Sequence, residues 1–205
     1  MESKNILIKK VKASAPVFTG LLREARVIPA VKSMEELHKV LTGDSKLVFV
    51  LFGDILSIPD IVARLKDAGK MVLVHLDLMD GLNSRDVAVD FLAKNTQADG
   101  ILSTKANLVK YAKGRGLLTV QRFFILDSMA LLNIEKQFPL NYTDAIEILP
   151  GLMPKVIRHL AGLVDIPIIA GGLISDREDA LAALNAGALA VSTTKTDLVQ
   201  SFKQG

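Results

Sequence analysis

The stretch "IPIIAGGLISDREDALAALNAGALAVSTT", residues 166–194, decides the fold because it contains one complete strand–helix–strand unit. Two short apolar runs, "IPIIAGG" (166–172) and "ALAVSTT" (188–194), flank a segment whose apolar residues recur at helical spacing. Near-continuous apolar runs of this length are typical of parallel strands that are buried on both faces. The stretch therefore predicts one β–α–β unit of a parallel sheet.

The same alternation continues along the rest of the chain. Three of the segments between apolar runs begin with the spacing of a capping box: Ser33 with Glu36, Ser57 with Asp60, and Ser175 with Glu178. Each of these segments is predicted to form a helix, and the three helices are predicted to end at Gly43, Gly69 and Gly187. We expect eight strands, near residues 26–31, 47–53, 71–77, 98–104, 117–124, 144–151, 166–172 and 188–194.

Eight such units favour an α/β fold, a small (β/α)₈ barrel of the TIM type with short loops, formed as one domain by residues 1–205. The alternative is an open doubly wound sheet, which usually has G-x-G-x-x-G after its first strand; here the first strand ends in "PAVKS". The segment "FTGLLRE" (18–24) is expected to form a short helix that closes the bottom of the barrel.

Composition limits the class of protein. With 205 residues, 50% of them hydrophobic, the chain can bury the core of one globular domain. The absence of cysteine excludes disulfides and thiolate-bound zinc and is consistent with a reducing cytosol. No apolar run is long enough to span a membrane, so we expect a cytoplasmic protein with no membrane partner.

The charge of the chain is mildly basic, with a formal net charge of +3. This balance permits binding of phosphate or nucleic acid, although ordinary solubility explains it equally well. Because the chain has no Trp and only 5% aromatic residues, a nucleic-acid surface would have to be a folded basic patch.

In a barrel of this type, side chains at the carboxyl ends of the strands converge on one mouth, where binding or chemistry occurs. The sequence places a polar set there: Asp54, His75, Asp77, Lys105, Gln121, Arg122, Glu147, Ser192, Thr193 and Thr194. Lys46 and Lys70 lie at strand starts, on the opposite face, and are interpreted as solvated. Since Gln121 and Arg122 are neighbours on one strand, only one of them can face the barrel axis, and the sequence does not decide which.

A phosphate site is predicted where the last two strands end. Glycine lets the backbone approach an anion closely and present its N–H groups, and in these barrels phosphate often binds after strands seven and eight. We expect the site to contain Gly171, Gly172, Ser192, Thr193, Thr194 and Lys105. Alternatively, the glycines only make a tight turn and the threonines only cap a helix.

The remaining mouth residues are suited to hydroxyl groups. His75 and Asp77 are two positions apart on a predicted strand, so their side chains should point the same way. Glu147 is a carboxylate in an apolar strand and must meet a cation, donors or a metal. A structural network and a metal site of His75, Asp77 and Glu147 are alternatives, although no ligand-spacing motif supports the metal site.

Catalysis is not indicated strongly. No strand has a lysine in its interior, as a Schiff-base barrel requires, whereas an acid–base isomerase using Glu147 and His75 stays open. We expect no catalytic residue, no metal and no cofactor. His38 and His159 lie in predicted helices and are interpreted as surface or packing residues.

Several long blocks resemble the glycerol uptake operon antiterminator family. They are "LFGDIL" (51–56), "HLDLMDGL" (75–82), "ADGILSTK" (98–105), "TVQRFFILDS" (119–128), "EILPGLMPKVI" (147–157), "IIAGGLI" (168–174) and "AVST" (190–193). The resemblance implies a bacterial cytoplasmic regulator that binds glycerol 3-phosphate and acts on leader mRNA of glycerol-utilisation genes. Such a regulator permits transcription past a terminator and stabilises the transcript.

On this interpretation the phosphate binds at the glycines and threonines, with Lys105 or Arg122 neutralising its charge, and Glu147, Asp77 and His75 bind the glycerol hydroxyls. The RNA would contact a basic rim that includes Lys32, Lys155 and Lys195. Two alternatives remain: an isomerase, lyase or phosphodiesterase acting on a small phosphorylated metabolite, and a sensor that acts through a protein partner. The sequence leaves the oligomeric state open.

Overall fold

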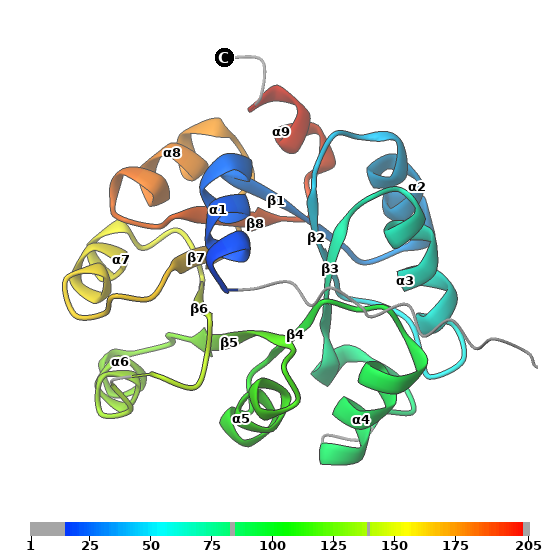
Figure 1. The fold of residues 1–205 in the computed structure, drawn as a ribbon. Helices are drawn as coiled ribbons and strands as arrows, with labels where there is room; N and C mark the ends of the chain where they lie inside the picture. Colours follow the sequence, from blue (N-terminus) through cyan, green and yellow to red (C-terminus); the bar gives the residue numbers. More distant parts are fainter. Residues whose placement is uncertain (1–14, 83–84, 139, 203–205) are drawn as a thin grey trace, which may run out of the picture.

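The computed structural model describes residues 15–82, 85–138 and 140–202. Eight parallel strands pair in sequence order and close into a barrel, with the helices outside it (Figure 1). The strands are β1 (Val27–Val31), β2 (Leu47–Val50), β3 (Met71–His75), β4 (Gly100–Ser103), β5 (Leu118–Phe124), β6 (Ala145–Leu149), β7 (Ile168–Gly171) and β8 (Ala190–Thr193). Each strand lies within its predicted range, so the predicted barrel is confirmed.

A helix follows each strand, and one more precedes the first. The helices are α1 (Ala15–Ala25), α2 (Met34–Thr42), α3 (Ile58–Asp67), α4 (Asp86–Asn95), α5 (Ala106–Gly114), α6 (Ser128–Glu135), α7 (Pro154–Ala161), α8 (Arg177–Asn185) and α9 (Thr196–Ser201), and a short 3₁₀ turn, η1 (Leu76–Leu78), follows β3. Among the helices that the structure describes, none is long and apolar enough to cross a bilayer.

The predicted helix starts are partly correct. Ser33 caps α2, since its Oγ accepts a hydrogen bond from the Glu36 N–H at 3.2 Å. Ser57 does not cap α3, because its hydroxyl bonds to Asp54 instead. The cap of α8 is Asp176, one residue after the predicted Ser175.

The predicted helix ends are also partly correct. Gly69 and Gly187 have the left-handed conformation expected after a helix, with φ of 73° and 113°. Gly43 ends α2 in an extended conformation, with φ of −84°, so the left-handed end predicted there is wrong.

Helix α1 closes the amino end of the barrel, as predicted. Its Phe18 and Leu22 are fully buried and belong to the interior cluster. That cluster includes the first residues of four strands, Leu47, Met71, Leu118 and Ala145. In Figure 1, α1 accordingly lies across the end of the barrel that faces the viewer. Residues 1–14, which precede α1, lie outside the described residues.

Two lysines on the amino-end face differ from one another, although both were expected to be solvated. Lys46 is exposed and pairs with Glu24 of α1 at 2.8 Å. Lys70 is only 4% exposed, because its Nζ donates to the carbonyls of Gly43 at 2.7 Å and Ser45 at 3.0 Å. Lys70 therefore has a structural role in holding the α2–β2 loop.

Candidate functional site

A cavity of about 390 Å³ opens at the carboxyl ends of the strands, mainly between β5, β6, β7 and β8. Its walls are formed by Ala30, Leu51, Arg122, Glu147, Leu149, Gly172, Leu173, Ile174, Ser175, Ser192, Thr193, Thr194 and Lys195. This volume lies within the range of small-molecule sites. The cavity thus lies at the mouth where barrels of this type bind their ligands.

Glu147 is the most buried polar group of the mouth, with 0% exposure. Its partner in the β5–β6 register is Arg122, whose Nε donates to Glu147 Oε2 at 2.6 Å. The hydroxyl of Ser192 donates to Glu147 Oε1 at 2.5 Å. The expectation that this carboxylate meets a cation and donors is confirmed.

Gly171 makes room for this network. Its residue lies in β7, between the strands of Glu147 and Ser192. A Cβ at position 171 would lie 2.5 Å from Glu147 Oε1 and 2.6 Å from Ser192 Oγ. Because real Cβ atoms do not come so close to oxygen, a side chain here would displace the network.

The structure shows which of the two β5 residues faces the axis. Leu118 and Val120 belong to the interior cluster, so the two-residue period of a strand turns Arg122 inward as well. Gln121 faces outward, and its Nε2 donates to the Thr104 carbonyl at 2.9 Å. Of the two candidates that the sequence left open, Arg122 therefore faces the mouth and Gln121 does not.

Arg122 also has hydrogen-bond donors that Glu147 does not use. Its guanidinium lines the cavity and is bound through Nε alone, and within the described part of the chain no acceptor binds its two Nη groups. The side chain is only 8% exposed, so these donors lie in a largely enclosed space. They are available to an anionic or hydroxylated ligand.

The loop after β7 has an unusual backbone. Gly172 and Leu173 both adopt positive φ, 72° and 62°, and both line the cavity. Left-handed backbone is uncommon for leucine, and such conformations cluster at binding sites. The N–H groups of Leu173 and Thr194 donate to no acceptor among residues 15–82, 85–138 and 140–202. Nothing in the sequence signals the conformation of Leu173, and sequence analysis missed it.

Two parts of the predicted phosphate site have other roles. The hydroxyl of Thr193 donates to the Ile174 carbonyl at 2.8 Å and accepts the Lys195 N–H at 3.1 Å, so it ties the two loops together. Lys105 is exposed at the start of α5 and does not line the cavity. Lys195, expected only at an RNA surface, lines the cavity instead.

The amino end of α8 is already occupied. Asp176 Oδ1 accepts the Asp179 N–H at 2.9 Å, and Asp179 in turn accepts the Ser175 N–H and hydroxyl. Three carboxylates at or near this helix start, from Asp176, Glu178 and Asp179, repel another anion. A phosphate in the cavity would therefore meet loop N–H groups and side-chain cations, and not the amino end of α8.

His75 ends β3 with 2% exposure, and its Nδ1 has no hydrogen-bond partner among the described residues. Burial, and then the charge of Arg122, lower its pKa to about 4, so the imidazole is neutral near pH 7. A neutral imidazole can donate to or accept from a ligand hydroxyl.

Asp77 does not share the orientation predicted from a continuous strand. The chain leaves β3 at His75 and enters the 3₁₀ turn η1. The Asp77 carboxylate accepts from the Ser103 hydroxyl at 2.8 Å and from the Thr104 N–H and hydroxyl at 2.7 and 2.8 Å. It holds β3 to the end of β4 and does not line the cavity.

Asp54 has a local role too. Its Oδ1 accepts from the Leu56 N–H at 2.8 Å and from the N–H and hydroxyl of Ser57 at 2.7 and 2.9 Å. These bonds lower the pKa of Asp54 and fix the turn before α3. Asp54 was expected at the mouth, but it does not line the cavity.

The candidate metal ligands do not come together, and the three predicted rim lysines lie at the surface. Within the described ranges, no group of three His, Asp or Glu side chains could hold a metal ion, so His75, Asp77 and Glu147 do not form such a site. Lys32, Lys155 and Lys195 are exposed, and of the three only Lys195 borders the cavity.

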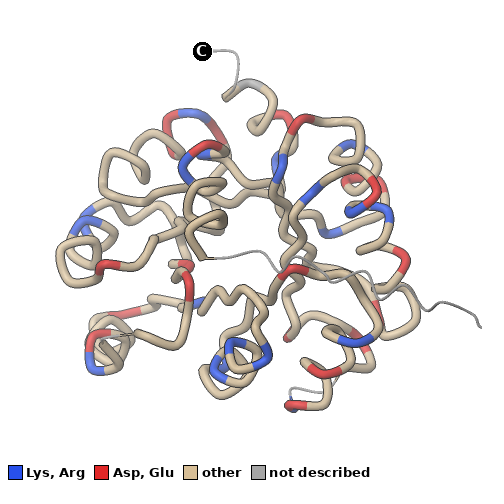
Figure 2. Tube along the Cα trace, in the orientation of Figure 1, with Lys and Arg blue, Asp and Glu red and all other residues tan. Residues whose placement is uncertain are grey.

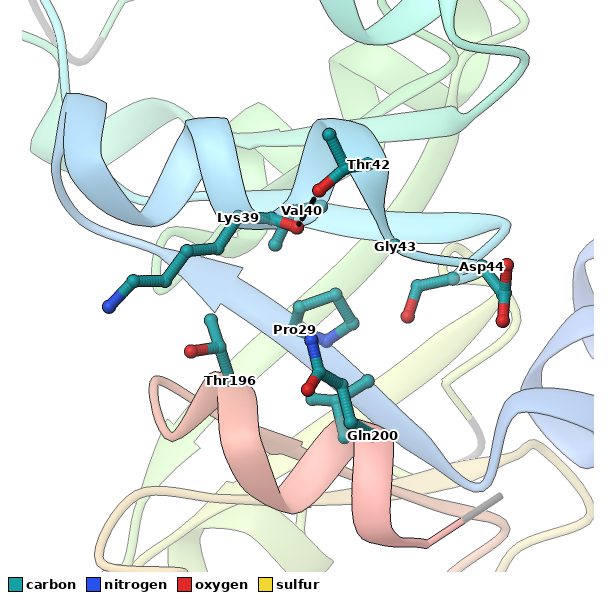
Figure 3. A pocket seen from close by; sticks show the side chains of 10 residues that line it. Pro29, Lys39, Val40, Thr42, Gly43, Asp44, Thr196 and Gln200 are labelled. Carbon is teal, nitrogen blue, oxygen red and sulfur yellow. Dashed lines mark hydrogen bonds between the residues drawn. The ribbon is translucent and has the colours of Figure 1, made fainter. Parts of the chain in front are cut away.

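A second hollow, of about 290 Å³, lies on the outside of the barrel between α2 and α9 (Figure 3). Pro29 of β1 forms part of it, together with Lys39, Thr42, Thr196 and Gln200. No buried charged side chain is among its lining residues, since Lys39 is exposed and paired with Glu35. The mouth cavity is the better candidate for a ligand site.

Comparison with known proteins agrees with the sequence blocks. A family model described as "Glycerol-3-phosphate responsive antiterminator" matches residues 27–199. The uncharacterized protein YgcP of Escherichia coli (strain K12) is 44% identical over 86% of this chain and 92% of its own.

Solved structures show the same relationship. A glycerol uptake operon antiterminator regulatory protein from Listeria monocytogenes has 34% identity and a TM-score of 0.79, covering 82% of this chain and 91% of that one. An antiterminator-related protein from Thermotoga maritima has 34% identity and a TM-score of 0.75, covering 85% and 97%. The deoxyribose phosphate aldolase of Aeropyrum pernix, at 15% identity, a TM-score of 0.67 and coverage of 93% and 99%, shares only the fold.

Proposed function

The chain belongs to the glycerol-3-phosphate responsive antiterminator family, and on this basis we propose that it binds glycerol 3-phosphate in the mouth cavity and then acts on leader mRNA of glycerol-utilisation genes. In this proposal the protein is a cytoplasmic regulator whose ligand favours read-through of a terminator and stabilises the transcript. The observation that supports it most directly is the set of unpaired donors around the cavity, which suits a phosphorylated polyol.

The phosphate is proposed to lie against the β7 and β8 loops. There the free N–H groups of Leu173 and Thr194 can donate to it, and Gly172 presents no side chain. Lys195 and the Nη groups of Arg122 line the same cavity and can neutralise its charge. Backbone N–H groups and cations together are the usual phosphate ligands.

The glycerol hydroxyls are proposed to meet Glu147, which lines the cavity, and His75, which does not line it but faces the barrel axis, as Met71 and Leu73 of the same strand do. Each carboxylate oxygen of Glu147 accepts one bond, from Arg122 or Ser192, and retains capacity for a second donor. The neutral His75 has an unpartnered Nδ1. An unpaired buried nitrogen is unfavourable, so a ligand hydroxyl that satisfies it gains affinity.

We further propose that the protein performs no chemistry on its ligand. Lysine is absent from all eight strands, so a Schiff base of the aldolase type has no amine in the barrel. Both carboxylate oxygens of Glu147 are already hydrogen-bonded to Arg122 and Ser192, which leaves this group poorly placed as a free general base.

Phosphorus NMR tests the proposal directly. The protein is titrated against sn-glycerol 3-phosphate and the sample is followed for several hours. We expect the phosphate signal to shift or broaden without a new peak. A new peak would show turnover and favour an enzyme, and an unchanged spectrum would contradict the ligand. Binding of the leader RNA with and without glycerol 3-phosphate then tests the output.

A further inference from the structure

We propose that the RNA is bound on the outer side of the barrel, on a surface formed by α5, α6 and α7, and not around the mouth. This inference rests on the proposed function, because it names the RNA-contacting face of the same protein. We call this face the α5–α7 surface and define it by three cations that lie away from the mouth: Lys110, Lys136 and Arg158.

Charge separates α5 and α7 from the other helices. Neither α5 nor α7 contains Asp or Glu, whereas each of the other helices that the structure describes contains at least one. Figure 2 shows basic but no acidic positions on α5. The helices α5 and α7 flank α6, as Figure 1 shows, so their cations lie on one side of the barrel.

The cations of the α5–α7 surface are not neutralised by neighbours. No described carboxylate forms an ion pair with any of these three cations, while Lys39, Lys46 and Lys66 elsewhere are each paired. Lys110 lies over the ring of Tyr142 at 4.7 Å, which orients its ammonium group without cancelling its charge.

The two carboxylates on this surface are already engaged. Asp127 caps the start of α6, where its Oδ1 accepts the Ala130 N–H at 2.8 Å. Glu135 bonds to His159 of α7 at 2.7 Å, which also joins α6 to α7. The surface therefore presents a net positive field, which attracts a polyanion.

The mouth face has a different character. Its loops expose large apolar side chains, including Leu56 at 87%, Leu126 at 85% and Leu173 at 71%. Asp54, Asp80 and Asp176 lie among the same loops. Aliphatic and acidic groups are poor contacts for RNA phosphates, so the basic rim expected from sequence is not the better surface.

Three double variants, each losing two exposed cations, test the assignment in the full-length protein. Lys110→Gln with Arg158→Gln alters the α5–α7 surface, and Lys32→Gln with Lys155→Gln, which do not line the ligand cavity, alters the rim. Arg23→Gln with Lys94→Gln, on α1 and α4, is the matched control. Binding of a leader RNA that includes the terminator hairpin is measured by fluorescence anisotropy at several salt concentrations, with saturating glycerol 3-phosphate.

We expect the α5–α7 pair of substitutions to weaken RNA binding about 10-fold at low salt and to reduce the log–log salt slope by about 1.4, the value for two contacts to a single strand. The other two double variants should retain the wild-type slope, and all three should keep the wild-type circular dichroism spectrum. Phosphorus NMR should show wild-type ligand binding for the α5–α7 variant.

The outcomes separate the two ideas. If the salt slope of RNA binding falls in the rim variant, or falls equally in all three variants, the assignment to the α5–α7 surface is wrong and the proposed function stands. If the wild-type protein binds glycerol 3-phosphate but no leader RNA, the RNA function and this inference both fail, and a protein partner becomes the better hypothesis.

Discussion

Glu147 and Ser192 belong to β6 and β8, yet Oε1 of one lies 2.5 Å from Oγ of the other, across the intervening strand β7. They meet above Gly171, the position at which a Cβ would approach both oxygens within 2.6 Å. A single missing side chain thus allows one carboxylate to connect three strands at the mouth.

Gly171→Ala should therefore abolish ligand binding and lower the free energy of unfolding by about 1–3 kcal/mol, because the new methyl group displaces the Glu147–Ser192 hydrogen bond. Isothermal titration with glycerol 3-phosphate and urea denaturation measure the two effects. Gly114→Ala is the control, since no heavy atom lies within 4 Å of a Cβ there. Equal effects at both positions would show that residue 171 has no special role.

The buried pair of Arg122 and Glu147 should show strong coupling. Arg122→Met or Glu147→Gln alone leaves the other group without its partner, so each should destabilise the protein by about 3–5 kcal/mol. The double variant Arg122→Met/Glu147→Gln should be less destabilised than the sum of the two single variants. Urea denaturation of the four proteins gives the coupling energy; additive effects would mean that the ion pair contributes nothing.

The ligand site should distinguish Lys105, which the sequence placed at the phosphate, from Lys195, which it placed at the RNA rim. Lys195 borders the cavity and Lys105 does not. Lys195→Gln should weaken glycerol 3-phosphate binding about 3- to 10-fold, the effect of an exposed charge-assisted contact, and Lys105→Gln should leave it unchanged. Titration calorimetry measures the affinity of each variant for glycerol 3-phosphate. If only Lys105→Gln weakens binding, the phosphate lies at the loop after β4 instead.

His75 should make stability depend on pH. Burial, followed by the charge of Arg122, lowers its pKa from 6.5 to about 4. Between these values the unfolded chain binds more protons than the folded one, so the free energy of unfolding falls as pH decreases from 6.5 to about 4.

Near His75, Asp77 extends the acid sensitivity to lower pH. Burial raises its pKa, but bonds from Thr104 and Ser103 outweigh burial and lower it below 3.8. Its contribution is therefore lost only as pH falls further. From about pH 7 to about pH 5, His75 alone should account for about 2 kcal/mol. Urea denaturation of wild type and His75→Gln at both pH values checks this. The free energy of unfolding of the variant should change less between the two pH values, and an equal change in both proteins would contradict the assignment.

The sequence was sufficient to predict all eight strands, because fully buried parallel strands leave continuous apolar runs such as "LVFV" of β2. It was also sufficient to predict that Glu147 needs partners. It could not show which partners, because Arg122 and Ser192 are 25 and 45 positions away in the chain and meet Glu147 only through barrel closure.

Other errors arose where the backbone departs from a regular element. Asp77 was placed beside His75 by strand alternation, but a 3₁₀ turn intervenes. Lys70 was expected in solvent, although two loop carbonyls bind its ammonium group. Leu173 has an ordinary side chain and an uncommon φ of 62°, which no single sequence signals.

The packed interior of the barrel, which Phe18 and Leu22 of α1 complete at the amino end, has a kinetic consequence. Because no passage runs through such a core, a metabolite bound in the mouth cavity would enter and leave by the mouth alone. If the transcript is held on the side wall formed by α5, α6 and α7, the mouth stays open. The protein could then sample a falling metabolite concentration while it remains on the transcript, and release of the metabolite would precede release of the RNA.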